Sequence, residues 1–164
     1  MKNLLLSLLI LFTLNTFSFA QKSAKALYVE IGGPGLASIN YDMRFKKEEA
    51  GLGFRVGVGG YSLKYDFSGS KESVLFLPVG LNYLLGKDQK HYFELGVGYT
   101  YVDQKSSNNY NYNGDFTSSF GNLTFGYRIA PANGGFFFKA EITPVFGKGF
   151  FIPYYGGVGF GYKF

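Results

Sequence analysis

The sequence contains no cysteine and a single histidine, His91. The absence of cysteine excludes a disulfide, a thiolate metal site, a thiol nucleophile and a lipid anchor on an N-terminal cysteine. One histidine among scattered carboxylates does not supply the ligand spacing of a metal site, so we expect no metal and no other cofactor. The fold must therefore rest on backbone pairing and side-chain packing.

The first 20 residues have the three parts of a secretory signal. Lys2 is basic, residues 4–14 form an almost unbroken apolar stretch, and Ser18-Phe19-Ala20 supplies small residues for a signal peptidase. A spanning helix needs about 20 apolar residues, so this stretch is too short to be an anchor. We therefore predict a cleaved signal peptide over residues 1–20 and a single domain over residues 21–164.

Charge is scarce in the predicted mature chain. Without Lys2, its 144 residues carry 15 basic and 11 acidic side chains, about 18%, against about 25% in an ordinary soluble domain. The net charge of +4 is too small and too scattered to indicate a nucleic-acid partner. Glycine and aromatic residues are abundant instead, so we expect something other than water to face much of the surface.

Strict alternation of apolar residues with glycine or polar residues recurs along the chain, which is typical of strands. In the last segment Val158, Phe160 and Tyr162 share one face, while Gly159, Gly161 and Lys163 share the other. The same pattern predicts eight strands, over residues 25–33, 36–45, 51–61, 74–85, 91–102, 116–129, 135–144 and 154–164.

One predicted strand breaks the alternation, and another contains a proline. Leu123, Phe125 and Tyr127 share a face that, continued backward, misses Phe120, so we expect a bulge near Gly121 to restore the phase. Pro78 weakens the strand over residues 74–85 because proline cannot donate to a ladder.

After the first connection, short connections between the predicted strands alternate with longer ones, which lie over residues 61–73, 103–115 and 145–153. This order predicts a barrel with both termini in the periplasm.

Alternation alone does not decide which face points outward, because a soluble secreted carrier of the lipocalin kind has the same period with its apolar face inside. Glycine clusters on the polar face, where the narrow interior of an eight-stranded barrel needs small residues. The apolar face is long and aromatic on nearly every strand, as in a lipid-facing band. We therefore predict an all-β fold, an eight-stranded antiparallel up-and-down transmembrane β-barrel in a bacterial outer membrane.

The signal peptide, the eight alternating segments and the final Tyr162-Lys163-Phe164 resemble the small outer-membrane barrels of the OmpA/OmpX type. The resemblance covers the whole mature chain and implies a Gram-negative envelope, with outer-membrane lipid as the surroundings. It also implies that the terminal aromatics Phe160, Tyr162 and Phe164 are the signal read by the barrel-assembly machinery during insertion. A lipid-facing role for the same three side chains is equally compatible with the pattern.

The polar faces of the predicted strands would collect four acids and five bases inside the barrel. Unpaired charge is strongly disfavoured in so narrow a space, so we expect a mutually paired network that plugs the barrel. A gated path for protons or ions is the alternative. The residues of this predicted interior charge network are Glu30, Asp42, Arg44, Arg55, Glu94, Arg128, Lys139, Glu141 and Lys163.

Two of the longer connections are candidates for binding. Residues 106–114 are polar and rich in tyrosine, as adaptable binding loops often are, although a solvated cap would look the same. The connection over residues 145–153 is unusually apolar and indicates contact with lipid or with an envelope protein partner, or else folding over the barrel mouth. Its candidate contact residues are Phe146, Phe150, Phe151 and Ile152.

An enzyme acting on outer-membrane lipid, an acyl hydrolase or transferase, is the second class of function. Such chemistry needs a nucleophile activated by a base and an acid that orients the base. His91 is the only histidine, and the nearby Asp88 and Glu94 do not make a triad with it. We therefore predict no catalytic residue, and a structural or interaction subunit that is accessory to a larger envelope complex.

Overall fold

The computed structural model describes residues 23–65, 70–106 and 116–164. The predicted signal peptide lies outside the described residues, as does nearly all of the tyrosine-rich segment 106–114. No helix in the described ranges is long and apolar enough to cross a membrane. The elements described are β1 (Lys25–Gly32), η2 (Gly33–Gly35), β2 (Ala37–Arg44), β3 (Gly51–Tyr65), β4 (Ser70–Leu85), β5 (His91–Ser106), β6 (Phe120–Ile129), β7 (Gly135–Ile142), β8 (Val145–Gly147), β9 (Phe150–Ile152) and β10 (Gly156–Lys163).

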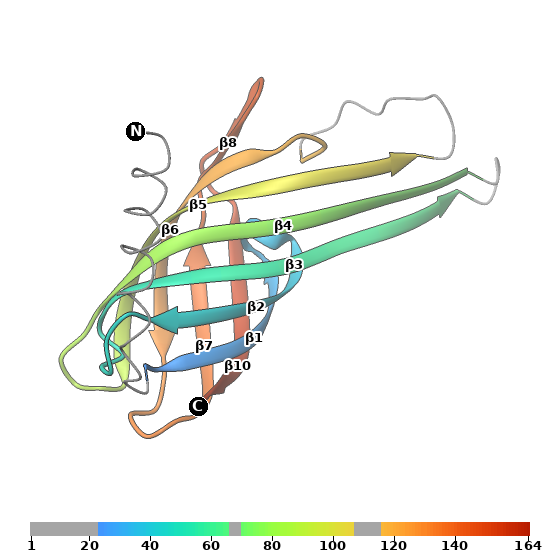
Figure 1. Cartoon of the computed structure of the whole chain (residues 1–164). Helices are drawn as coiled ribbons and strands as arrows, with labels where there is room; N and C mark the ends of the chain where they lie inside the picture. The colour runs from blue at the N-terminus through green and yellow to red at the C-terminus, as the bar shows by residue number, and fades with distance from the viewer. Residues whose placement is uncertain (1–22, 66–69, 107–115) are drawn as a thin grey trace, which may run out of the picture.

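Eight of the described strands form one closed barrel with antiparallel neighbours throughout (Figure 1). Strands β1 to β7 follow one another around the wall, and β10 pairs with both β7 and β1 to close it. Lys25 and Phe164 exchange backbone hydrogen bonds, so both ends of the described chain lie at one end of the barrel, which we name the terminal end. The opposite end is the hairpin end. The predicted fold class is confirmed.

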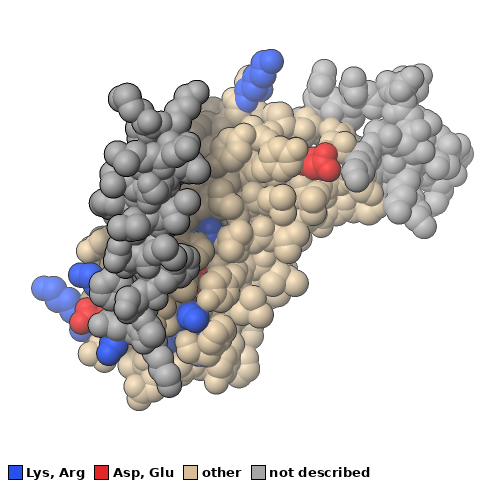
Figure 2. Space-filling model, in the orientation of Figure 1, with Lys and Arg blue, Asp and Glu red and all other residues tan. Residues whose placement is uncertain are grey.

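Successive side chains along each strand alternate between the outside and the inside of the barrel. On β1, Val29 and Ile31 are 53% and 71% exposed, whereas Tyr28 and Glu30 are buried. The other strands repeat this order, and most of the face in Figure 2 between the two ends is neither acidic nor basic. The apolar face therefore points outward, which is the reverse of a soluble carrier barrel.

The predicted bulge near Gly121 is wrong. The ladder between β5 and β6 runs without a shift from His91–Ile129 to Thr100–Phe120. Phe120 faces the interior and is 1% exposed, in phase with the inward-facing Asn122. The prediction failed because it assumed that every aromatic side chain of this strand faces outward.

An extra residue does occur elsewhere, between β9 and β10. From the pair Ile142–Gly156 to the pair Val145–Ile152, one strand advances three residues and its partner four. The connection predicted over residues 145–153 is thus a continuation of the wall, because β8 pairs with β6 and β9 pairs with β8. Pro78 lies within β4, and the ladder to β3 is interrupted opposite it, as expected for a residue without an N–H.

Strands β3, β4 and β5 are longer than predicted and project beyond the rest of the barrel at the hairpin end (Figure 1). β2 pairs with β3 only as far as Gly59, and β6 pairs with β5 only as far as Thr100. Past these residues the three strands continue as a sheet of their own, which we name the projecting sheet. It comprises residues 60–65, 70–75 and 101–106.

Candidate functional site

All nine residues of the predicted interior charge network lie inside the barrel, each with 6% or less of its surface exposed. They come from every barrel strand except β4. The strands that contribute them have polar residues at the inward positions of this level. Ion pairs join eight of the nine into two overlapping groups, one around Arg128 and one around Lys139. The strand register thus brings together residues that are far apart in sequence.

Arg128 is the centre of the group nearer the terminal end. Its guanidinium lies 2.8 Å from an Asp42 carboxylate oxygen and 2.9 Å from a Glu94 carboxylate oxygen. Arg44 pairs with the other oxygen of Asp42, and the Asn82 amide donates to both Asp42 and Glu94, at 2.8 and 3.0 Å. Hydrogen-bonded pairing of this kind is what makes buried charge tolerable.

Lys139 is the centre of the second group. Its ammonium lies 2.7 Å from Glu141, 3.4 Å from Glu30 and 3.6 Å from Glu94, and it also sits over the ring of Tyr28. Arg55 lies 3.4 Å from Glu30 on the other side of the group. Because Glu94 pairs with both Arg128 and Lys139, the two groups form one connected network.

Glu49 completes this network, although the sequence did not predict it as an interior residue. Glu49 lies in the turn between β2 and β3, yet its residue is only 8% exposed and its carboxylate reaches Arg128 at 3.5 Å and Lys163 at 3.3 Å. Five acids now face five bases among the described interior residues. Alternation along a strand cannot show whether a turn residue points into the barrel. The only sign of Glu49 in the sequence was that the predicted network had five bases but only four acids.

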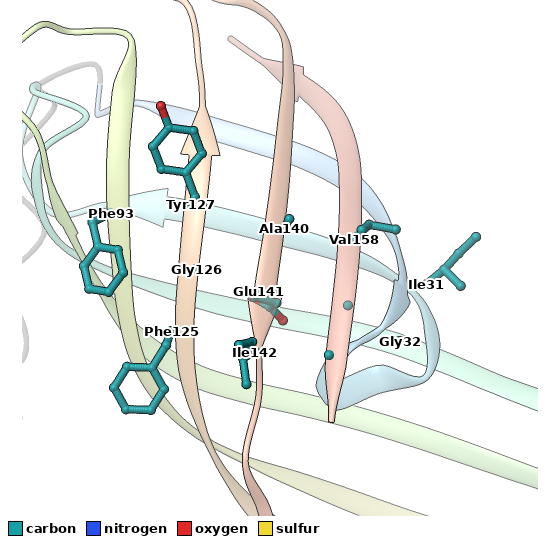
Figure 3. Close-up of a pocket in the computed structure, with 12 residues that line it drawn as sticks. Ile31, Gly32, Phe93, Phe125, Gly126, Tyr127, Ala140, Glu141, Ile142 and Val158 are labelled. Carbon is teal, nitrogen blue, oxygen red and sulfur yellow. The ribbon is translucent and has the colours of Figure 1, made fainter. Parts of the chain in front are cut away.

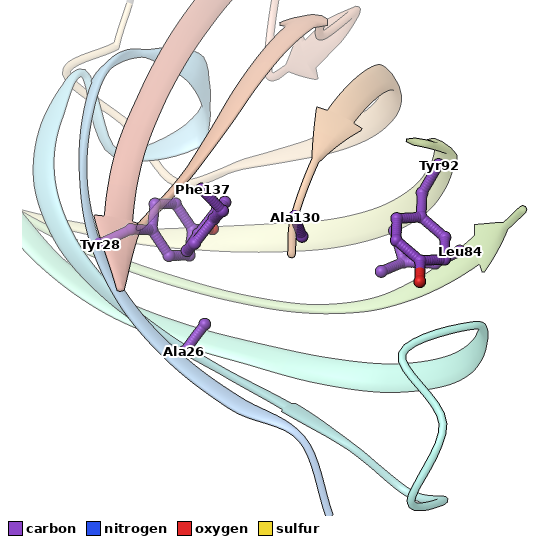
Figure 4. Close-up of a cluster of buried hydrophobic side chains, with 6 residues drawn as sticks. All are labelled: Ala26, Tyr28, Leu84, Tyr92, Ala130 and Phe137. Atoms are coloured by element: carbon purple, nitrogen blue, oxygen red, sulfur yellow. The ribbon is translucent and has the colours of Figure 1, made fainter. Parts of the chain in front are cut away.

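Apolar side chains pack beside the charges toward both ends of the barrel. At the terminal end Tyr28 packs edge-on against Phe137, and Tyr92 lies beside Leu84 (Figure 4). At the hairpin end a second cluster is built on Phe120. Its buried members are Val74, Phe76, Val102, Phe120 and Val145, and Leu36, Phe116, Phe150, Ile152 and Tyr155 pack against them.

The β1–β2 connection folds into the barrel between the second cluster and the charges. All three residues of η2 are buried, and the Thr100 hydroxyl of β5 donates to the Pro34 carbonyl at 2.9 Å. A Cβ on Gly33 would come within 2.9 Å of the Glu30 carboxyl group and 2.8 Å of Glu141. Glycine at this position therefore lets the backbone lie directly on the charge network.

The four candidate contact residues of the apolar connection divide between two faces. Phe150 and Ile152 pack onto the interior cluster, whereas Phe146 and Phe151 are opposite each other on the outer face, 44% and 63% exposed. Only the latter two are placed to meet lipid or a partner. The terminal aromatics Phe160, Tyr162 and Phe164 all point outward, each about half exposed or more.

His91 begins β5 on the outer face at the terminal end, with Tyr127 of β6 beside it. The Tyr127 hydroxyl lies 2.6 Å from His91 Nδ1, and Asp88 Oδ2 lies 4.0 Å from Nε2. The backbone N–H groups of His91 and Lys90 donate to the Asp88 carboxylate, which holds the pKa of that carboxyl below its usual range. The hydrogen-bond partner of His91 is thus a phenol rather than the serine of an acyl hydrolase.

Comparison with solved structures places this architecture among known barrels. The outer membrane protein Ail of Yersinia pestis superposes with a TM-score of 0.55 at 12% identity, covering 87% of this chain and 98% of Ail. The chain has the fold of the small eight-stranded outer-membrane barrels.

Two further solved outer-membrane proteins superpose with lower TM-scores. The N-terminal β-barrel domain of Pseudomonas aeruginosa OprF gives a TM-score of 0.45 at 13% identity, covering 88% of this chain and 98% of that one. The outer membrane enzyme PagL gives 0.41 at 15%, covering 84% and 96%. No protein-family model matches the chain, and no curated protein matches it significantly in sequence. A likeness of fold alone does not decide function.

Proposed function

We propose that this protein is an integral outer-membrane barrel of a Gram-negative envelope, with both termini in the periplasm, that acts as a structural or interaction subunit and not as a pore or an enzyme. The outward apolar face supports the membrane location, because a closed barrel satisfies every backbone group within lipid. The short turns at the terminal end and the long strands at the hairpin end support the orientation.

The observation that carries the proposal is the filled interior together with the projecting sheet. Paired charges fill the middle of the barrel and an apolar cluster closes it toward the hairpin end, so the described interior offers no continuous polar path. The projecting sheet, in contrast, extends past the barrel wall. Beyond Gly59, the edge of β3 that faces away from β4 has no neighbouring strand among the described residues. An exposed sheet edge is a template for an added strand, which is a common way to bind an extended peptide segment.

Trimming the projecting sheet tests this role. Ser62 and Ser73 are paired across β3 and β4, so an Asn-Gly turn can replace residues 63–72 without changing the barrel. We expect the tagged full-length protein to retain a stoichiometric partner when outer membranes are gently solubilised, and the trimmed variant to lose it. The matched control carries the same Asn-Gly turn in place of Lys148-Gly149, between β8 and β9. A lone monomer in all three preparations would refute the interaction role.

The alternative, a lipid acyl hydrolase or transferase, depends on His91 as the only available imidazole base. We expect His91→Ala to leave the acylation pattern of outer-membrane lipid unchanged, because no serine among the described residues is paired with this side chain. Mass spectrometry of lipid extracted from cells with either form of the protein measures this. A lipid modification that disappears with His91→Ala but persists in the control Lys87→Ala would favour the enzyme.

A further inference from the structure

Two hollows follow one another on the outer wall of the barrel along β6 and β7. The larger is an open groove of about 700 Å³ that crosses β6, β7 and β10. The smaller, of about 400 Å³, lies at the terminal end between the β4–β5 and β6–β7 turns. We name them the groove and the niche.

The groove exists because two outward positions carry almost no side chain. A row of paired residues crosses the wall at this level, in the order Tyr127, Ala140 and Val158. Ala140 forms a floor between Tyr127 and Val158 (Figure 3), and Gly156 adds open space in the next row, beside Ile142. An apolar depression in a lipid-facing wall fits a flexible hydrocarbon chain.

A polar pair lies on β5 and β6 between the groove and the niche, at the level of Phe138 of β7, which lines neither hollow. The Tyr127 hydroxyl points away from the groove toward the terminal end (Figure 3), where it meets His91 Nδ1 at 2.6 Å. His91 is paired across the strands with Ile129, which lines the niche. A ligand that occupies both hollows would therefore pass from apolar walls to hydrogen-bonding groups within one or two residues of strand.

The niche combines one basic and one acidic side chain with apolar walls. Lys90 and Asp88 line it together with Ile129 and Phe136. The Asp88 carboxylate remains charged at neutral pH, since two backbone N–H groups donate to it. This pair of opposite charges matches a zwitterionic group better than a singly charged one.

We propose that the groove and the niche together bind one molecule of phosphatidylethanolamine. An acyl chain lies in the groove, the ester region lies at Tyr127 and His91, the phosphate meets Lys90 and the ammonium meets Asp88. Binding from the periplasmic leaflet follows from the proposed orientation, on which this part of the inference rests. Lipid selectivity itself does not depend on the orientation or on a protein partner.

Lipid retention tests the proposal. The full chain is reconstituted in nanodiscs of equal parts phosphatidylethanolamine and phosphatidylglycerol, re-extracted in mild detergent and analysed for co-purified lipid by mass spectrometry. We expect about one phosphatidylethanolamine per barrel, enriched over the bulk mixture. Ala140→Phe fills the groove and should lower this retention at least about tenfold, because the chain loses the burial of several methylene groups.

Further variants separate the groove from the niche. Lys90→Gln should lower retention about threefold, the size expected from an exposed ion pair. Asp88→Asn should shift retention toward phosphatidylglycerol. Val56→Phe, at an exposed outward position on β3 that lines neither hollow, is the matched control and should retain lipid as the wild type does. Faster migration of unboiled samples on a denaturing gel verifies that each variant is folded.

Two results would overturn the proposal. One is a retained lipid mixture with the composition of the bulk nanodisc. The other is an equal loss of phosphatidylethanolamine in Ala140→Phe and Val56→Phe, which would show that any added aromatic disturbs lipid contact. Both readouts use purified protein, so neither depends on whether the projecting sheet binds a partner.

Discussion

Replacing Arg128 by methionine lowers the free energy of unfolding by about 3 to 5 kcal/mol, the cost of breaking a buried ion pair by removing one partner. Arg128 is 1% exposed and pairs with Asp42, Glu94 and Glu49. Methionine fills much of the same space but leaves these carboxylates without their main counter-charge. Urea unfolding of the protein in lipid vesicles, followed by tyrosine fluorescence, measures the loss.

Two further variants calibrate this result. Glu49→Gln removes one of the three partners, and the longest of the three contacts, so its effect should be smaller. Lys87→Met removes a charge from an exposed turn and should change the free energy of unfolding by less than about 0.5 kcal/mol. An Arg128→Met loss no larger than that of Lys87→Met would mean that the interior charges do not stabilise the barrel.

Gly32→Val disrupts the seam between the first and last strands. Gly32 has a φ of 76°, and a Cβ there would lie 2.2 Å from the Gly156 carbonyl oxygen of β10. The backbone conformation alone costs about 1 to 3 kcal/mol for a residue with a side chain. The clash adds to this cost, so we expect a total loss above about 3 kcal/mol and a reduced yield of refolded barrel.

The control for Gly32→Val is Gly149→Val in the β8–β9 hairpin. Gly149 has a φ of 85°, yet a Cβ there would meet nothing within 4 Å. The difference between the two variants therefore reports the clash with β10 apart from the backbone strain. Equal losses in the two variants would show that Gly32 is not required for close approach at the seam.

The strands and the interior charges could be predicted from alternation because lipid and a narrow interior impose opposite demands on successive residues. Val158 and Lys163, for example, obey the pattern. Phe120 does not, since an apolar cluster inside the hairpin end accepts an aromatic residue facing inward. The projecting sheet was missed because residues 62–65, 70–73 and 103–106 are mostly polar and do not alternate. Glu49 was missed because side chains in a turn do not alternate between the inside and the outside of the barrel.

The outer groove also could not be predicted from the sequence. Ala140 and Gly156 are unremarkable within their own strands, and only the register between β7 and β10 places them diagonally across from each other with larger residues around them. Likewise, the 2.6 Å contact between Tyr127 and His91 depends on the pairing of β5 with β6. Contacts between strands depend on which residues are paired across them. The alternation along one strand does not show this pairing.

The central claim is that paired charges and two apolar clusters fill this barrel, so that it does not conduct. Single-channel recording of the purified protein in planar bilayers tests it most directly. We predict a baseline current without sustained steps, in the wild type and in the control Lys87→Met alike. Sustained, large conductance steps from the wild-type protein would contradict the account.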